Sequence, residues 1–183
     1  MEDATPVGDA AARLAALEPR CTTEQALAFF DELPTVAPEA IGGRWAGREL
    51  DTRHPWNGLL SASGWYGKQF DGPDAVHPLL FRTPKGTLFP LNPAWIPLRL
   101  VGRVPPAAVS AARRLLDLAR PLLQTHEPKA RLRSVEYRGR VSAAMIYDQL
   151  PIVDVLRRVD DTTLLGLMDT RATAQPFFFV LNR

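Results

Sequence analysis

The stretch Gly43-Arg44-Trp45-Ala46-Gly47 begins the part of the chain that decides the fold. A tryptophan flanked by glycines on a first strand suits the base of a β-barrel, because the indole can plug one end while glycine lets backbones pack closely. Beyond it, short apolar runs alternate with Gly, Pro, Asn and Asp, which is typical of strands joined by turns. We expect strands over residues 44–51, 63–70, 76–82, 87–91 and 95–101.

Helical patterns stand before and after this strand group. Residues 10–17 are rich in alanine and predict a short helix. Thr22 and Gln25 have the spacing of a capping box, ahead of a second helical run that Pro34 should end. Residues 105–125 predict one amphipathic helix, which Pro121 should kink or end early.

Five more strands are expected after that helix. Ten short strands without a β-α-β alternation favour antiparallel pairing and a closed or nearly closed barrel. The predicted fold is mainly β (α+β): an antiparallel barrel of about 8–10 strands, with an N-terminal helix and one helix inserted between two strand groups. A barrel of this size can enclose one small ligand. The expected strands are 130–138, 140–147, 152–159, 163–168 and 177–181.

We expect one structural domain made of four consecutive parts. The chain has 183 residues, of which 46% are hydrophobic and 23% charged, and this composition excludes wholesale disorder. The parts are an N-terminal helical arm (1–40), the first half of the barrel (41–104), a connecting helix (105–125) and the second half of the barrel (126–183).

The cysteine count and the apolar runs exclude further classes. Cys21 is the single cysteine, which excludes an internal disulfide framework and a cysteine-based metal cluster. Residues 1–6 are acidic and lead into no apolar run, so we expect no signal peptide. The longest apolar run, residues 177–181, is far too short for a membrane span. We therefore expect a cytoplasmic protein without stable membrane insertion.

The positive charge is concentrated in the middle of the chain. Residues 99–140 carry nine Arg and one Lys against three acidic residues, a net charge of +7, although the whole chain has a net charge of only +2. Such a block is either a set of solvated positions or a surface for an anionic partner. We expect no nucleic acid partner, because single-strand binders interleave aromatics with basic residues and this block contains only Tyr137.

The sequence does not decide whether two arginines of this block point into the barrel or away from it. Along residues 129–138, Val135 and Tyr137 fall on the same face as Arg131 and Arg133. A bulge near Ser134 would leave both arginines outside. Without a bulge, they would point with Tyr137 into the barrel, where each would need a carboxylate of the protein or of a ligand.

The first strand group resembles the GXWXG family, a group of uncharacterised bacterial and eukaryotic proteins. The resemblance rests on residues 43–60, on Gly64-Trp65-Tyr66-Gly67-Lys68-Gln69-Phe70 and on residues 76–81. The C-terminal part is similar to the domain of unknown function 4334 that usually accompanies it. The resemblance implies a bacterial protein with a calycin-like barrel and no settled activity. The C-terminal residues that carry it are 129–133, 135–139, 145–148, 150–154 and 165–169.

We expect neither a cofactor nor a metal. The Gly-x-Trp-x-Gly pattern also resembles the first strand of nitrobindin-like haem barrels, but no His follows His126 to serve as an axial ligand on a late strand. His54, His77 and His126 have no metal-ligand spacing, and the first two each precede a proline.

The leading hypothesis is a protein that binds a hydrophobic small molecule or lipid, possibly with an anionic head group, inside the barrel. A second hypothesis is an enzyme acting on an apolar substrate, with His54 oriented by Asp51, and with Tyr66 and Lys68, as acid–base groups. A third is an interaction protein that presents the basic helix, residues 106–124, to an acidic partner. The expected ligand-binding residues are Trp45, Trp56, Trp65, Tyr66, Arg131, Arg133, Tyr137, Met145 and Tyr147.

The oligomeric state is left open by the C-terminal strand. Phe177, Phe178 and Phe179 are consecutive, so they place apolar side chains on both faces of one strand. This pattern suits either two-sided burial under a helix or a seam of a homodimer.

Overall fold

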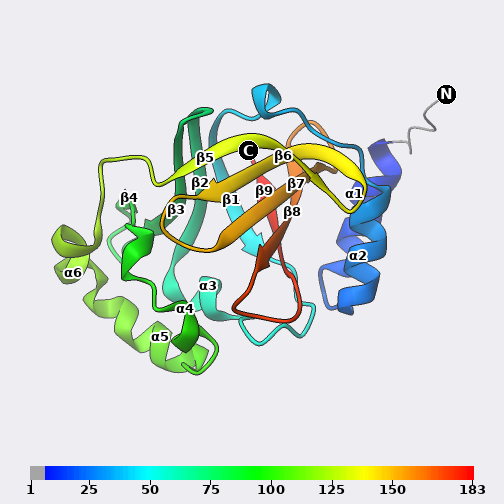
Figure 1. Ribbon diagram of the computed structural model, residues 1–183. Helices are drawn as coiled ribbons and strands as arrows, with labels where there is room; N and C mark the ends of the chain where they lie inside the picture. The colour runs from blue at the N-terminus through cyan, green and yellow to red at the C-terminus, as the bar shows by residue number, and fades with distance from the viewer. Residues whose placement is uncertain (1–6) are drawn as a thin grey trace.

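The computed structural model describes residues 7–183 (Figure 1), so the expectation about a signal peptide in residues 1–6 lies outside the described residues. Within this range every strand pairs with antiparallel neighbours. The strands are β1 (Gly43–Glu49), β2 (Trp65–Gly72), β3 (Ala75–Arg82), β4 (Leu88–Pro90), β5 (Ala130–Tyr137), β6 (Arg140–Tyr147), β7 (Ile152–Arg158), β8 (Thr163–Thr170) and β9 (Phe177–Asn182).

The sheet closes on itself. Its order is β2-β1-β9-β8-β7-β6-β5-β3-β4, and a further pairing of β2 with β3 joins the two sides into a ring of eight strands. The ninth strand, β4, extends from β3 outside the ring. Closure removes the unpaired edges that a sheet of this size would otherwise expose. The predicted antiparallel barrel is therefore confirmed.

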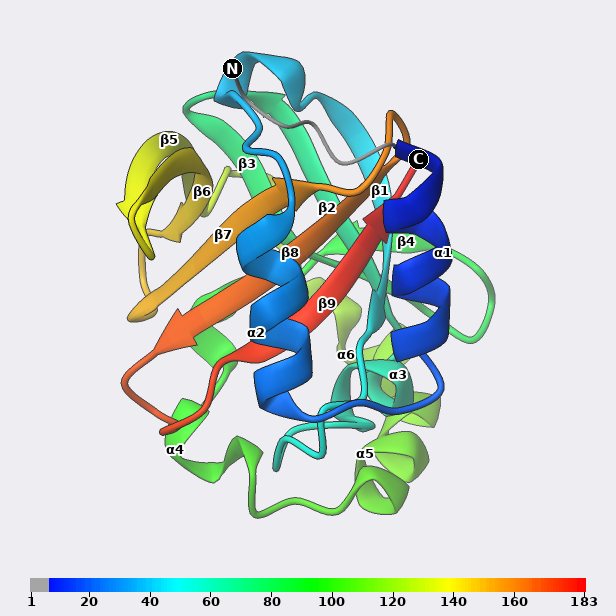
Figure 2. The ribbon, with the colours of Figure 1, turned by 90° about the vertical axis from the view of Figure 1, so that its right-hand side faces the viewer.

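Two N-terminal helices cover the outside of the barrel. Helices α1 (Val7–Leu17) and α2 (Thr23–Glu32) lie over β7, β8 and β9 (Figure 2). The predicted capping box is present: the Thr22 hydroxyl accepts from the backbone N–H of Gln25, whose side chain accepts from the N–H of Thr22. Phe178 packs under α2 against Phe30, while Phe177 and Phe179 point into the barrel. Strand β9 is thus buried on both faces, which is the first of the two alternatives that we expected, burial under a helix.

The glycine–tryptophan motif fixes one part of the barrel interior. Trp45 is 2% exposed, and its indole N–H donates to the carbonyl oxygen of Gly42 at 3.1 Å. Gly47 lies directly under the indole ring of Trp65: a Cβ at this position would come within 2.2 Å of that ring. The absence of a side chain at Gly47 therefore lets the six-membered ring of Trp65 approach β1 closely.

Residues 93–123, which we name the helical cap, connect the two strand groups. The cap lies on the other side of the molecule from α1 and α2 (Figure 1). The prediction of one continuous helix is too simple, because a 3₁₀ turn separates two helical pieces and the second ends two residues after Pro121. The cap contains η2 (Pro93–Trp95), α4 (Leu98–Val101), α5 (Pro106–Ala112), η3 (Arg113–Leu115) and α6 (Leu116–Leu123); elsewhere lie η1 (Pro38–Ala40) and α3 (Leu59–Ser63).

The strand expected over residues 95–101 is wrong. Pro93 occupies the first turn of η2, where a missing N–H costs no hydrogen bond. The Asn92 side chain accepts from the backbone N–H of Ala94 and caps this turn. A second proline, Pro97, precedes α4 directly. These local capping interactions favour helical turns over the extended backbone that the apolar alternation suggested.

Among the described residues, no helix has the length and apolar character needed to cross a membrane.

Candidate functional site

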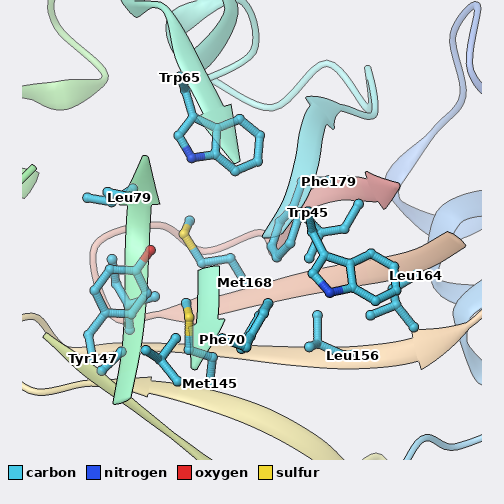
Figure 3. Close-up of a cluster of buried hydrophobic side chains, with 14 of the residues drawn as sticks. Trp45, Trp65, Phe70, Leu79, Met145, Tyr147, Leu156, Leu164, Met168 and Phe179 are labelled. Carbon is cyan, nitrogen blue, oxygen red and sulfur yellow. The ribbon is translucent and has the colours of Figure 1, made fainter. Parts of the chain in front are cut away.

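The barrel interior contains a cavity of about 100 Å³ between the strands and the helical cap. Figure 3 shows Trp65, Leu79, Tyr147, Met168 and Phe179 gathered in this part of the core. Nearly all of the wall is apolar. The lining residues are Trp56, Leu59, Leu60, Trp65, Lys68, Leu79, Ile96, Leu98, Val101, Tyr147, Leu150, Ile152, Asp154, Met168, Phe177 and Phe179.

Two charged side chains interrupt this apolar wall. The Lys68 ammonium donates to Oδ2 of Asp154 at 2.7 Å and to the carbonyl oxygen of Pro78 at 3.3 Å. The side chains of Lys68 and Asp154 are only 3% and 1% exposed. Removing two charges from water is expensive, and their mutual attraction repays it only when the remaining donors and acceptors are also satisfied.

The surroundings of Lys68 are aromatic. Its ammonium nitrogen lies 4.7 Å from the centre of the Phe179 ring, 5.6 Å from that of Tyr147 and 5.7 Å from that of Trp65. Such contacts stabilise a cation that has left water. Burial, and then the negative charge of Asp154, raises the pKa of Tyr147 well above its ordinary value, so the phenol keeps its proton.

Two polar atoms of the cavity-lining residues have no hydrogen-bond partner. Oδ1 of Asp154 and the indole nitrogen of Trp65 are buried without a hydrogen bond to any described group. Buried polar atoms normally find partners, and an unmade bond costs free energy. Desolvation raises the pKa of Asp154, although the adjacent Lys68 opposes this shift. Asp154 and Trp65, two residues that line the cavity, therefore each keep one buried polar atom without a partner in the described protein.

The position of Lys68 depends on an irregularity in β2. In a regular strand Tyr66 and Lys68, both expected as acid–base groups, would share a face. The pairing with β3 shifts register on both sides of Gly67, and there Trp65, Lys68 and Phe70 are all buried inside. Tyr66 instead faces outward, where the Arg82 guanidinium lies 4.8 Å from its ring. Bulges often redirect a side chain in this way beside functional sites.

Asp154 was not among the predicted site residues, although the sequence holds a signal for it. In β7, Ile152, Asp154 and Leu156 alternate with Val153 and Val155. The first three point into the barrel and the two valines pack under the N-terminal helices. A carboxylate between two inward apolar residues of a predicted strand would have indicated a buried charge.

Five of the predicted ligand-binding residues lie inside the barrel, and they form two groups. Trp56, Trp65 and Tyr147 line the cavity, as does the proposed acid–base group Lys68. Trp45 and Met145 belong to the same interior cluster but do not line the cavity.

The suggestion that Arg131 and Arg133 point into the barrel is wrong. Arg131 pairs with Asp148 at 2.9 Å on the outer surface, and Arg133 pairs with Asp74 there. No bulge is needed, since β5 and β6 pair in continuous register. Tyr137 also faces outward, like Val135, because both pack beside the N-terminal helices. The outer face of β5 is thus polar at one end and apolar at the other.

His54 and Asp51 do not form the expected acid–base pair. Nδ1 of His54 accepts from the backbone N–H of Trp56, and Nε2 donates to the carbonyl oxygen of Gln175 at 3.2 Å. Asp51 instead accepts from the backbone N–H of Arg53, which lowers its pKa, and from the Arg20 side chain. Burial lowers the pKa of His54, which favours the neutral ring.

No group of three or more metal-ligating side chains gathers within residues 7–183.

Comparisons with known proteins agree with the fold. A family model described as "GXWXG protein" matches residues 28–86, and the domain of unknown function DUF4334 matches residues 128–183. A solved structure, "Crystal structure of protein from Thermomonospora curvata", is 31% identical and aligns with a TM-score of 0.71. The alignment covers 96% of this chain and 98% of that one. The comparison with curated proteins finds no match.

Proposed function

We propose that this chain, which belongs to the family of GXWXG proteins with a C-terminal domain of unknown function 4334, binds a small uncharged apolar molecule inside its barrel. The ligand carries one hydrogen-bonding group, such as a hydroxyl, that meets Lys68 and Asp154. The observation that carries the proposal is that Asp154 lines an otherwise largely apolar cavity while its buried Oδ1 has no hydrogen-bond partner. A ligand hydroxyl would supply the hydrogen bond that this oxygen lacks.

The charge of the site favours a neutral ligand over an anion. Within the described part of the chain, Lys68 is the only cation that lines the cavity, and Asp154 balances its charge. An anionic head group was expected because of Arg131 and Arg133, but both guanidiniums pair with carboxylates on the outer surface. A second negative charge beside Asp154 would be repelled in a low-dielectric interior.

The size of the cavity limits the ligand further. Pockets for drug-sized molecules measure roughly 300–1,000 Å³. The cavity here is about 100 Å³, which suits a molecule of one small ring. A larger lipid would need outward movement of Ile96, Leu98 or Val101, the cap residues that close the cavity.

Calorimetric titration with three probes of similar size tests the proposal. Phenol has a hydroxyl that can donate to Asp154, toluene lacks it, and benzoate replaces it with a negative charge. We expect phenol to bind more tightly than toluene, and benzoate to bind most weakly. In the double variant Lys68→Met/Asp154→Leu the preference for phenol over toluene should disappear. Equal binding of all three probes by the natural protein would contradict the proposal.

A matched control separates this effect from a general loss of structure. The surface pair Arg131 and Asp148 can be changed in the same way, to Met and Leu, without touching the cavity. This control variant should keep the natural order of the three probes.

A second candidate function is proton transfer on a bound apolar substrate. It is favoured by one observation, the raised pKa of the desolvated Asp154 carboxyl beside the cavity. Cyclohexanone, whose α-hydrogens are weakly acidic, is a suitable probe: exchange of these hydrogens with deuterated water can be followed by NMR. Exchange faster with the natural protein than with Asp154→Asn would support this function. Binding of phenol without any such exchange supports the binding function alone.

A further inference from the structure

The helical cap exposes large apolar side chains on its outer surface. Leu115, Leu118 and Leu122 are 63%, 80% and 78% exposed, and Trp95 is 60% exposed. Scattered single apolar residues are ordinary on a protein surface, but a group on one element marks an interaction site.

The three leucines share one face of the cap. Their spacings of three and four residues place them along one side of η3 and α6. A different side of the same segment, which includes Leu116 and Leu123, packs against the barrel core. The exposed leucines are therefore not the buried face of an amphipathic helix, because Leu116 and Leu123 form that face.

The same segment is strongly basic. Residues 93–123 contain five arginines and a single acidic residue, Asp117. Arg99, Arg103 and Arg114 are exposed. A helical segment with Leu and Trp beside arginines is the composition of elements that lie in the interface of an anionic bilayer.

A second copy of the chain fits this surface less well. Two caps facing each other across a twofold axis would bring two sets of these arginines together, and like charges would repel. The cap is also interrupted by η3 and contains Pro121 within α6, so it offers no long straight helix for a coiled-coil seam.

We propose that the helical cap docks on an anionic lipid surface, with Leu115, Leu118 and Leu122 inserted among the lipids and the arginines at the head groups. This docking stands independently of the proposed ligand. Leu98 connects the cap surface with the internal cavity, because it lines both this cavity and an outer groove that includes Arg99 and Arg103. If the cavity binds an apolar molecule, docking brings the cavity wall that the cap forms close to a bilayer, in which apolar molecules dissolve.

Vesicle flotation of the full chain tests the docking. We expect binding to phosphatidylcholine vesicles that contain about one third phosphatidylglycerol, little binding to pure phosphatidylcholine, and weakening by salt. The variant Leu118→Ser/Leu122→Ser should bind about tenfold more weakly, because two exposed anchors are lost. The variant Arg103→Gln/Arg114→Gln should reduce the preference for the anionic vesicles.

A matched control and a second measurement keep the proposal falsifiable. Val141 is also exposed, at 57%, but lies on β6 outside the cap, so Val141→Ser should leave vesicle binding unchanged. Circular dichroism checks that the leucine variant remains folded. Absence of binding to anionic vesicles would overturn the proposal, as would self-association in sedimentation that the leucine variant abolishes while vesicles remain unbound. Equal binding by the natural chain and the leucine variant would also overturn it.

Discussion

The ammonium nitrogen of Lys68 lies 2.7 Å from Oδ2 of Asp154, and both side chains are almost completely buried inside the barrel. The two residues lie on β2 and β7, strands that are not neighbours in the sheet, so the ion pair crosses the barrel interior. A buried ion pair is weak support for stability, because desolvation offsets the attraction. Its placement beside an apolar cavity is the basis of the ligand binding that we propose.

Single and double substitutions of this pair should differ sharply in stability. Lys68→Met or Asp154→Leu alone should lower the free energy of unfolding by about 3–5 kcal/mol, because each leaves the other charge buried without its partner. The double variant should cost much less than the sum, since no buried charge remains. Urea unfolding measures all three free energies. Additive losses would show that the two side chains do not depend on each other.

The surface pair gives the comparison for that experiment. Breaking the exposed Arg131–Asp148 pair should change the free energy of unfolding by only about 0–1 kcal/mol.

Gly47→Ala should disturb the cavity through Trp65. The new methyl group would lie 2.2 Å from the indole ring, so the ring or the strand must move. We expect a loss of about 1–3 kcal/mol in the free energy of unfolding and a shift in tryptophan fluorescence. Gly42→Ala is the matched control, because nothing lies within 4 Å of the added Cβ there. An unchanged fluorescence spectrum in Gly47→Ala would contradict the described packing.

The fold could be predicted from the sequence where local patterns and burial agree. The Thr22–Gln25 capping box and the strand pattern of residues 130–181 match the structure closely. Residues 95–101 fail because proline and asparagine favour capped turns there. The inward face of β5 cannot be predicted from polarity, because helices cover its outer face at only one end. That face therefore carries both arginines and apolar residues.

The candidate site was only partly predictable for a different reason. Trp56, Trp65, Lys68 and Tyr147 were among the expected residues and do line the cavity. The partner of Lys68 could not be assigned, since β2 and β7 come together only through barrel closure, and the irregular pairing at Gly67 is not visible in an alternation pattern.

Acidification should destabilise the protein through His54. Burial lowers the pKa of this ring in the folded state, so below about pH 6.5 the unfolded chain binds more protons than the folded one. The free energy of unfolding should therefore fall as the pH drops from 7 toward 5. In His54→Gln this dependence should be shallower, whereas His126→Gln, at an exposed position, should leave it unchanged. Burial also lowers the pKa of His77, so some dependence should remain in His54→Gln.

Arg157 should tolerate an apolar replacement. It is fully buried under α2, its guanidinium lies 5.1 Å from the centre of the Phe30 ring, and its Nε and Nη1 atoms have no partner. Arg157→Met should leave the free energy of unfolding within about 1 kcal/mol or raise it, since the unpaired donors disappear while the packing is kept. Arg157→Ala should cost about 2–5 kcal/mol, because it opens a cavity. Thermal unfolding compares the two, and equal losses would show that the charge itself is needed.

The most direct test of ligand binding beside Lys68 and Asp154 is a phenol titration followed through the indole N–H signals in a ¹H–¹⁵N NMR spectrum. Trp56 and Trp65 line the cavity, Trp45 lies in the core with its N–H bonded to Gly42, and Trp95 is exposed on the cap. We predict saturable shifts of the Trp65 and Trp56 signals, with the Trp45 signal unchanged. Shifts confined to Trp95, or no saturable shift at Trp65, would contradict binding inside the barrel.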